Sequence, residues 1–294
     1  MVGFLLNPTQ LGFYAPAASL TSRVQTVGNG MVGFLLPSMS RAQAKSDLPT
    51  MRRMSILSIR ILLCFAMFIS IASVFFGREF IRIWLDNPDF TEKTYPVLVF
   101  LSLALLVRIP SAAVTSSLAG LGQVQLLANR AMLEAGTTVV LQLALAVPFG
   151  LPGVAAGLLI SQFLVVAALQ PQYLAKAIEM PVRSFLSQSL ARPAVAGLLT
   201  VVAAATLTRF WPIGVLADPL TTWIGMLGIR DSIANRVAQL FELGIQVAVV
   251  GAAMFPPVFF LCLDRDARSA FRPKWRKTAT PPPASLDSTE RGTN

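Results

Sequence analysis

Apolar residues come in blocks along the chain, and the charged residues gather between the blocks. A helix that rises 1.5 Å per residue needs about 20 residues to cross roughly 30 Å of hydrocarbon, so each block is long enough for a transmembrane helix. The pattern predicts spans at about residues 13–37, 56–76, 95–119, 126–149, 152–173, 194–211 and 240–263. We therefore expect an all-α fold, a polytopic membrane helical bundle with about seven transmembrane helices.

The spacing of these blocks divides the chain into three parts. Residues 1–174 carry five closely spaced spans and form one transmembrane bundle. Residues 175–263 add two further spans, separated by a long loop at residues 212–238. Residues 264–294 form a tail that is first basic and then of disordered composition.

The composition agrees with a membrane protein. Of 294 residues, 54% are hydrophobic and 13% are charged, whereas a soluble domain carries about 25% charged residues. A net charge of +10 is also typical of nucleic-acid binders, but basic loops beside an anionic membrane face explain it better, so we expect membrane lipids and no nucleic acid as partners.

Lys and Arg are more frequent in one set of connections, at residues 40–55, 120–130, 174–193 and in the tail from residue 264, than in the other set. Cytoplasmic loops carry this excess, so we expect a multi-pass protein with a cytoplasmic C-terminus and an outer N-terminus. An outer N-terminus without a signal peptide suggests that the sequence starts partway through a longer protein.

Few residues offer catalytic or metal-binding chemistry. The absence of histidine excludes His-dependent hydrolase triads and His-ligated metal sites. Cys64 and Cys262 lie in separate apolar runs without a Cys-x-x-Cys spacing, which gives no support to a disulfide or a zinc site. A membrane-embedded glycosyltransferase would need clustered acids in its outer loop, which offers only Asp218 and Asp231. We expect no enzyme, no cofactor and no metal.

Three stretches together resemble the polysaccharide flippases of the multidrug/oligosaccharidyl-lipid/polysaccharide exporter superfamily. LGFYAPAASLTSRVQTVGNGMVGFLLPSMSRAQAKSD is similar to the family's G-x-Y … P-x-x-S helix and basic loop, with Gly12, Tyr14, Pro37 and Ser40 in the motif positions. FFGREFIRIWLDNPDF is similar to an outer turn of the family, although Asp86 replaces the usual glycine. FGLPGVAAGLLIS is similar to the family's fGlpGvAlg turn and is the most specific of the three.

The resemblance covers most of residues 1–265 and implies the C-terminal half of a transporter built from two bundles around a central cavity. The partner would be a missing N-terminal lobe. The implied function is flipping a polyprenyl-pyrophosphate-linked oligosaccharide across the bacterial inner membrane, for lipopolysaccharide or exopolysaccharide biosynthesis. The alternatives are a multidrug or cation antiporter of the same superfamily and a membrane subunit without transport activity.

Charged residues inside the spans are the candidate site residues, because burying a charge in hydrocarbon costs about 3 kcal/mol or more. Arg108 lies within an apolar run. It would contact a substrate phosphate, pair with Glu134, or extend its side chain to the cytoplasmic interface.

The first span is the most polar, and Arg23, Gln25 and Asn29 on it are candidates for lining the cavity and binding substrate. Glu134 is the only acidic residue well inside a span. It would form an ion pair with Arg130 or with one of the other arginines, or it would couple transport to a proton or cation.

Overall fold

Long helices make up nearly all of the computed structural model, which describes residues 8–210 and 231–258. Within these residues there is no strand, which confirms the all-α fold. In chain order the helices are α2 (Pro8–Gly30), α3 (Leu35–Ala44), α4 (Leu48–Leu85), α5 (Pro88–Gly120), α6 (Val124–Ser161), the π-helix η1 (Gln162–Ala167), α7 (Ala168–Ala177), α8 (Val182–Phe210) and α10 (Asp231–Pro257).

Five helices of the described part are long and apolar enough to cross a membrane. The longest of them, residues 124–177, doubles back at Gly150 and so contains two of the expected spans. The protein is therefore a polytopic membrane helical bundle. The tail at residues 264–294 and residues 212–230 of the predicted loop lie outside the described residues, whereas residues 231–238 of that loop are helical.

The expected span at residues 13–37 is not one continuous helix. It is divided into α2 and α3 by a turn at residues 31–34, and it is not among the five apolar helices. Three glycines lie in or next to this turn, namely Gly28, Gly30 and Gly33. Glycine is a poor helix former because it loses the most backbone entropy on folding. A break of this kind inside a polar segment is tolerated where protein or water faces it rather than lipid.

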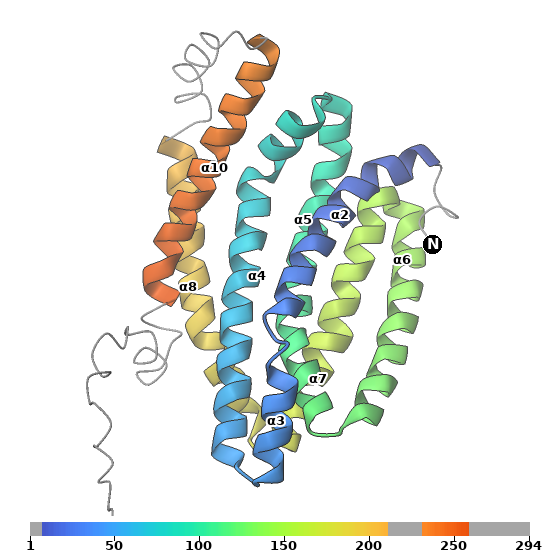
Figure 1. The fold of residues 1–294 in the computed structure, drawn as a ribbon. Coiled ribbons are helices and arrows are strands. Elements are labelled where there is room, and N and C mark those ends of the chain that lie inside the picture. Colours follow the sequence, from blue (N-terminus) through green and yellow to red (C-terminus); the bar gives the residue numbers. More distant parts are fainter. Residues whose placement is uncertain (1–7, 211–230, 259–294) are drawn as a thin grey trace, which may run out of the picture.

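Helices α4 and α5 form the centre of the bundle (Figure 1) and pack against each other along their lengths. Asp47 caps α4, and hydrogen bonds from Thr50 lower the pKa of the Asp47 carboxyl. Asn87 caps α5, its side-chain oxygen accepting hydrogen bonds from the amides of Asp89 and Phe90. These two caps fix where the central helices begin.

The other helices lie on two sides of this central pair. In Figure 1, α8 and α10 lie beside α4, whereas α2 and α6 lie beside α5. The main apolar core lies between α3, α4, α5 and α7, where Leu35, Met39, Leu62, Leu105 and Leu118 are almost fully buried. Helix α5 therefore contacts both α2 and α6.

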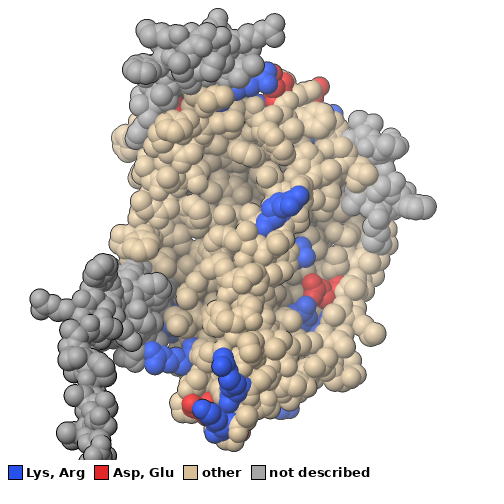
Figure 2. All heavy atoms as spheres, in the orientation of Figure 1, with Lys and Arg blue, Asp and Glu red and all other residues tan. Residues whose placement is uncertain are grey.

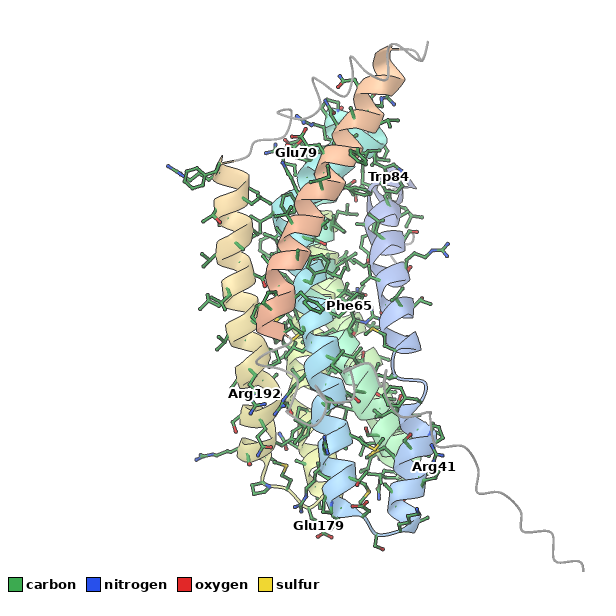
Figure 3. The ribbon with its side chains drawn as sticks, turned by 60° about the vertical axis from the view of Figure 1, so that its left-hand side comes forward. Arg41, Phe65, Glu79, Trp84, Glu179 and Arg192 are labelled. Atoms are coloured by element: carbon green, nitrogen blue, oxygen red, sulfur yellow. The ribbon has the colours of Figure 1, made fainter. Side chains whose placement is uncertain are left out.

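The bundle has two ends, which we name by their turns. The Gly122 end holds the turn between α5 and α6, and Figure 3 shows Arg41 and Glu179 there. The Gly150 end holds the turn inside α6, and Figure 3 shows Glu79 and Trp84 there. At the Gly122 end, Arg52 ties α4 to the turn after α7 by donating hydrogen bonds to the carbonyl oxygens of Ile178 and Glu179, at 2.9 Å and 2.5 Å.

The reversal inside α6 depends on glycine. Gly150 has φ 59° and ψ −133°, a conformation that residues with a Cβ rarely adopt. After the turn the two halves of α6 approach closely, and a Cβ on Gly157 would lie 2.8 Å from the backbone of Gln142. Gly157 therefore allows the two halves to pack backbone against backbone, as small residues do between membrane helices.

We predict that Gly157→Ala lowers the thermal stability of the chain in lipid nanodiscs, because the added methyl must push the two halves of α6 apart. Overpacking of this kind costs about 1–3 kcal/mol. Gly136→Ala is the matched control on the same helix, since a Cβ there meets no atom within 4 Å and alanine favours a helix by roughly 0.5–1 kcal/mol. Circular dichroism on heating would contradict the account if Gly157→Ala unfolded no earlier than the wild type.

Candidate functional site: a polar cleft along α5

Charged side chains enter the middle of the bundle beside α5. On the face shown in Figure 2, basic and acidic side chains gather mainly at the two ends, and a short column of both continues between α2 and α6 across an otherwise tan surface. Because α5 packs against α2 on one side and against α6 on the other, α5 forms the floor of this region. We call it the polar cleft, and its charged members are Arg108, Arg130 and Glu134.

Arg108 projects from the second half of α5, about 18 Å from the C-terminal end of that helix at 1.5 Å per residue. Its side chain is half-buried, and it interacts electrostatically with Glu134 and Tyr14. Within residues 8–210 and 231–258, no hydrogen bond or ion pair holds its guanidinium. Arg108 thus places a charge in the membrane region without a fixed partner.

Glu134 of α6 is held by two other residues. Its Oε2 atom lies 2.5 Å from Nη2 of Arg130, one helical turn earlier, and its Oε1 atom accepts a hydrogen bond from the Gln162 amide at 2.8 Å. The Arg130 and Glu134 side chains are only 13% and 22% exposed. Because both carboxylate oxygens already have partners, Glu134 forms no direct ion pair with Arg108 in this structure.

Further hydrogen bonds join the two halves of α6 next to this ion pair. The Ser161 hydroxyl lies 3.1 Å from the Thr137 hydroxyl and 2.6 Å from the Thr138 hydroxyl. The π-helix η1 begins at Gln162, the residue that contacts Glu134. Short π-helical turns are common at functional sites because they redirect side chains. Here the π-helix begins at Gln162, whose side-chain amide donates a hydrogen bond to the Glu134 carboxylate on the first half of α6.

Sequence reasoning did not identify Thr137, Thr138, Ser161 and Gln162 as members of the site. A signal was present, since polar side chains interrupt two apolar spans there. Hydrophobic periodicity gives the face on which a residue lies but not its partner on the neighbouring helix. The register of the hairpin, which sets those partners, follows from the turn at Gly150.

The candidates on α2 lie on different sides of that helix. Tyr14, Gln25 and Asn29 follow one another after eleven and four residues, close to whole helical turns, so they leave α2 on nearly the same side. Tyr14 interacts with Arg108, which puts this side of α2 toward the cleft. Arg23 lies about 200° around the helix from Gln25. It is exposed, and no hydrogen bond or ion pair holds it within the described residues.

The charges of the cleft favour an anion. Two guanidinium groups flank a single carboxylate whose oxygens are engaged. The Nε and Nη1 atoms of Arg130 are buried and have no hydrogen-bond partner, so this edge of the guanidinium can donate to a further acceptor. Among the described residues no group of three or more Cys, Asp or Glu side chains could hold a metal ion. The arrangement can bind a phosphate-like group, whose oxygens match the guanidinium fork.

Comparison with solved structures shows that the fold of this chain occurs in another protein. A solved structure titled "Lipid II flippase MurJ, inward closed conformation" superposes with a TM-score of 0.56 and 13% sequence identity, covering 85% of this chain and 48% of that one. The chain thus spans about half the length of that flippase. At this identity the match shows a similar fold and no more. No protein-family model and no curated protein sequence matches the chain.

We predict that Arg130 and Glu134 stabilise the bundle as a pair. Glu134→Gln leaves the Arg130 charge uncompensated, and breaking a buried pair costs about 3–5 kcal/mol, an upper value for this partly exposed pair. The double variant Arg130→Met with Glu134→Gln removes both charges and keeps an amide oxygen for Gln162, so it should recover more than half of the loss. Thermal unfolding of both single variants and the double variant measures this coupling. Losses that simply add would show that the two residues do not depend on each other.

Proposed function

We propose that this chain is one half of a membrane transporter that flips a polyprenyl-pyrophosphate-linked oligosaccharide from the cytoplasmic to the outer leaflet. The observation that carries the proposal is the unpaired guanidinium of Arg108 beside an occupied carboxylate. A positive charge held in the membrane region without a hydrogen bond or an ion pair is stabilised when an anionic group passes it. A pyrophosphate supplies such a group, whereas the polyprenyl tail remains in lipid.

The fold and the charge distribution support this proposal. The superposed structure is a lipid flippase by its title, which agrees with a transporter rather than an enzyme. In the described part of the chain, more basic residues lie at the Gly122 end than at the Gly150 end: Arg41, Lys45, Arg52, Arg53, Lys176 and Arg183 against Arg78, Arg82, Lys93, Arg209 and Arg236. This excess supports a cytoplasmic location of that end and of the C-terminus in the inner membrane of a bacterium. Lipopolysaccharide or exopolysaccharide precursors are the substrates that fit such an orientation.

A second bundle completes the transporter in this proposal. The chain spans 48% of the flippase it superposes on, and its α2 carries Arg23, Gln25 and Asn29 on surfaces that lipid would penalise. An N-terminal lobe packed over α2 and α6 would enclose the polar cleft and give these residues a hydrated path. Gln25 and Asn29 would then line that path together with Arg108, whereas Arg23 would face the added lobe from another side of α2.

A multidrug or cation antiporter of the same superfamily is the competing function. Such a protein would use an accessible carboxylate to bind its cation. Glu134, the acidic residue of the cleft, already contacts Arg130 and Gln162 through its two oxygens. The contacts therefore favour the flippase over the antiporter.

We predict that Arg108→Gln in the complete transporter slows flipping of a polyprenyl-pyrophosphate-linked oligosaccharide about 10- to 100-fold. A hydrogen bond to a charged group contributes about 1.5–3 kcal/mol, which corresponds to that range. The flipping rate of Arg108→Lys should lie between those of the wild type and Arg108→Gln, because lysine keeps the charge and loses the bidentate fork. Access of an external glycosidase to the glycan in proteoliposomes measures the rate.

Arg183→Gln is the matched control, since Arg183 is exposed at the Gly122 end, away from the cleft. Wild-type flipping by Arg108→Gln would reject the proposed role of the guanidinium. An antiporter would instead show cation-driven drug transport that Glu134→Gln abolishes and Arg108→Gln leaves intact.

A further inference from the structure

A second cavity lies at the Gly150 end of the bundle, separate from the polar cleft. It has a volume of about 400 Å³ and is formed where the start of α2, the start of α5 and the turn of α6 meet. Its lining residues are Gln10, Phe13, Glu92, Lys93, Pro96 and residues 149–152. Small-molecule sites in proteins have volumes of about 300–1,000 Å³, so this cavity can hold a small organic ligand.

Phe13, Pro96 and Phe149 contribute apolar surface to the cavity. Phe13 is buried and its ring packs on Phe90 with the ring centroids 4.5 Å apart, which fixes its orientation. Phe149 is 65% exposed and lies just before the turn at Gly150, and Pro96 of α5 also lines the cavity. Rigid rings of this kind offer a large contact area at low entropic cost.

The remaining lining groups are polar, and they include both donors and acceptors. The side-chain oxygen of Gln10 is buried and has no hydrogen-bond partner. Lys93 places its ammonium 4.7 Å from the centre of the Phe13 ring, and it keeps three N–H donors. Glu92 accepts a hydrogen bond from Arg78 at 2.5 Å, yet it is 68% exposed and retains acceptor capacity. A buried acceptor without a donor costs free energy unless a ligand satisfies it.

We propose that this cavity is a glycan-binding site. A sugar ring combines an apolar C–H face, which packs on aromatic rings, with hydroxyl groups that both donate and accept hydrogen bonds. Gln10 and Glu92 would accept from hydroxyl groups, and Lys93 would donate to them. A phosphate is disfavoured because Glu92 stands beside Lys93.

An acyl chain is disfavoured by the charged and amide groups of this lining. It fits better in the apolar groove of about 380 Å³ between α4, α5, α8 and the η1–α7 segment, where Leu63, Val114 and Phe163 contribute to the lining. The lining of the cavity at the Gly150 end thus suits a saccharide, whereas the lining of the apolar groove suits hydrocarbon.

The site deepens the proposed function and rests on it for its biological source. With the Gly122 end in the cytoplasm, the cavity opens on the outer side, where the oligosaccharide of a flipped lipid arrives. The site would then hold the glycan outside while the pyrophosphate leaves the arginines of the cleft. Sugar binding itself requires no transport, so the two proposals can fail separately.

The test uses the full 294-residue chain in lipid nanodiscs, with chitobiose and lactose as separate free probes. Saturation-transfer NMR should show contact with the ring protons of at least one of the two sugars. Gln10→Met and Phe149→Ala should each weaken the Kd roughly 3- to 10-fold, the effect of losing one hydrogen bond or one aromatic contact. Phe255→Ala is the matched control, since Phe255 is 68% exposed on α10.

Gln10→Met also separates binding from a structural role. It removes an unsatisfied buried oxygen and nearly keeps the side-chain volume, so a structural role alone predicts equal or higher thermal stability and unchanged sugar binding. Absence of saturation transfer from the wild-type chain to both sugars, or equal Kd values in all four proteins, would overturn the site. If a polyprenyl-pyrophosphate-linked glycan added to the nanodiscs failed to displace the bound sugar, the connection to the flipped lipid would be rejected.

Discussion

The structure depends on how charges inside the membrane region are neutralised. Glu134 is matched twice, by Arg130 on its own helix and by Gln162 across the hairpin. Arg108 is not matched by any hydrogen bond or ion pair in the described part of the chain. Because an isolated charge in hydrocarbon is costly, this difference separates a structural ion pair from a guanidinium that remains available to an anion.

The fold creates this difference through the reversal at Gly150. The turn brings the second half of α6 and the start of η1 back alongside the first half, so that Ser161 and Gln162 meet Thr137, Thr138 and Glu134. The same turn contributes residues 149–152 to the cavity at the Gly150 end. One glycine conformation therefore shapes both the polar cleft and the proposed glycan site.

Much of this fold could be predicted from the sequence, because hydrophobic blocks of bilayer length show directly in the order of residues. Arg108 and Glu134 could be found as charges in apolar runs. The contact of Glu134 with Gln162 could not be predicted, since residues 28 positions apart meet only through the hairpin register. The different directions of Arg23 and Gln25 could also be predicted, because each residue of an α-helix turns the side-chain direction by about 100°. The cavity beside Gln10 could not be foreseen, since it needs three segments distant in the sequence.

The most direct test of the account is whether water and anions reach position 108. With Cys64 and Cys262 replaced, Arg108→Cys in the complete transporter should react with a negatively charged, membrane-impermeant thiosulfonate reagent, which can reach this position only through water. Leu198→Cys provides the lipid-facing comparison, because Leu198 is 65% exposed near the middle of α8, and it should stay unmodified. An Arg108→Cys variant as unreactive as Leu198→Cys would contradict the claim that this arginine borders a hydrated path for a phosphate.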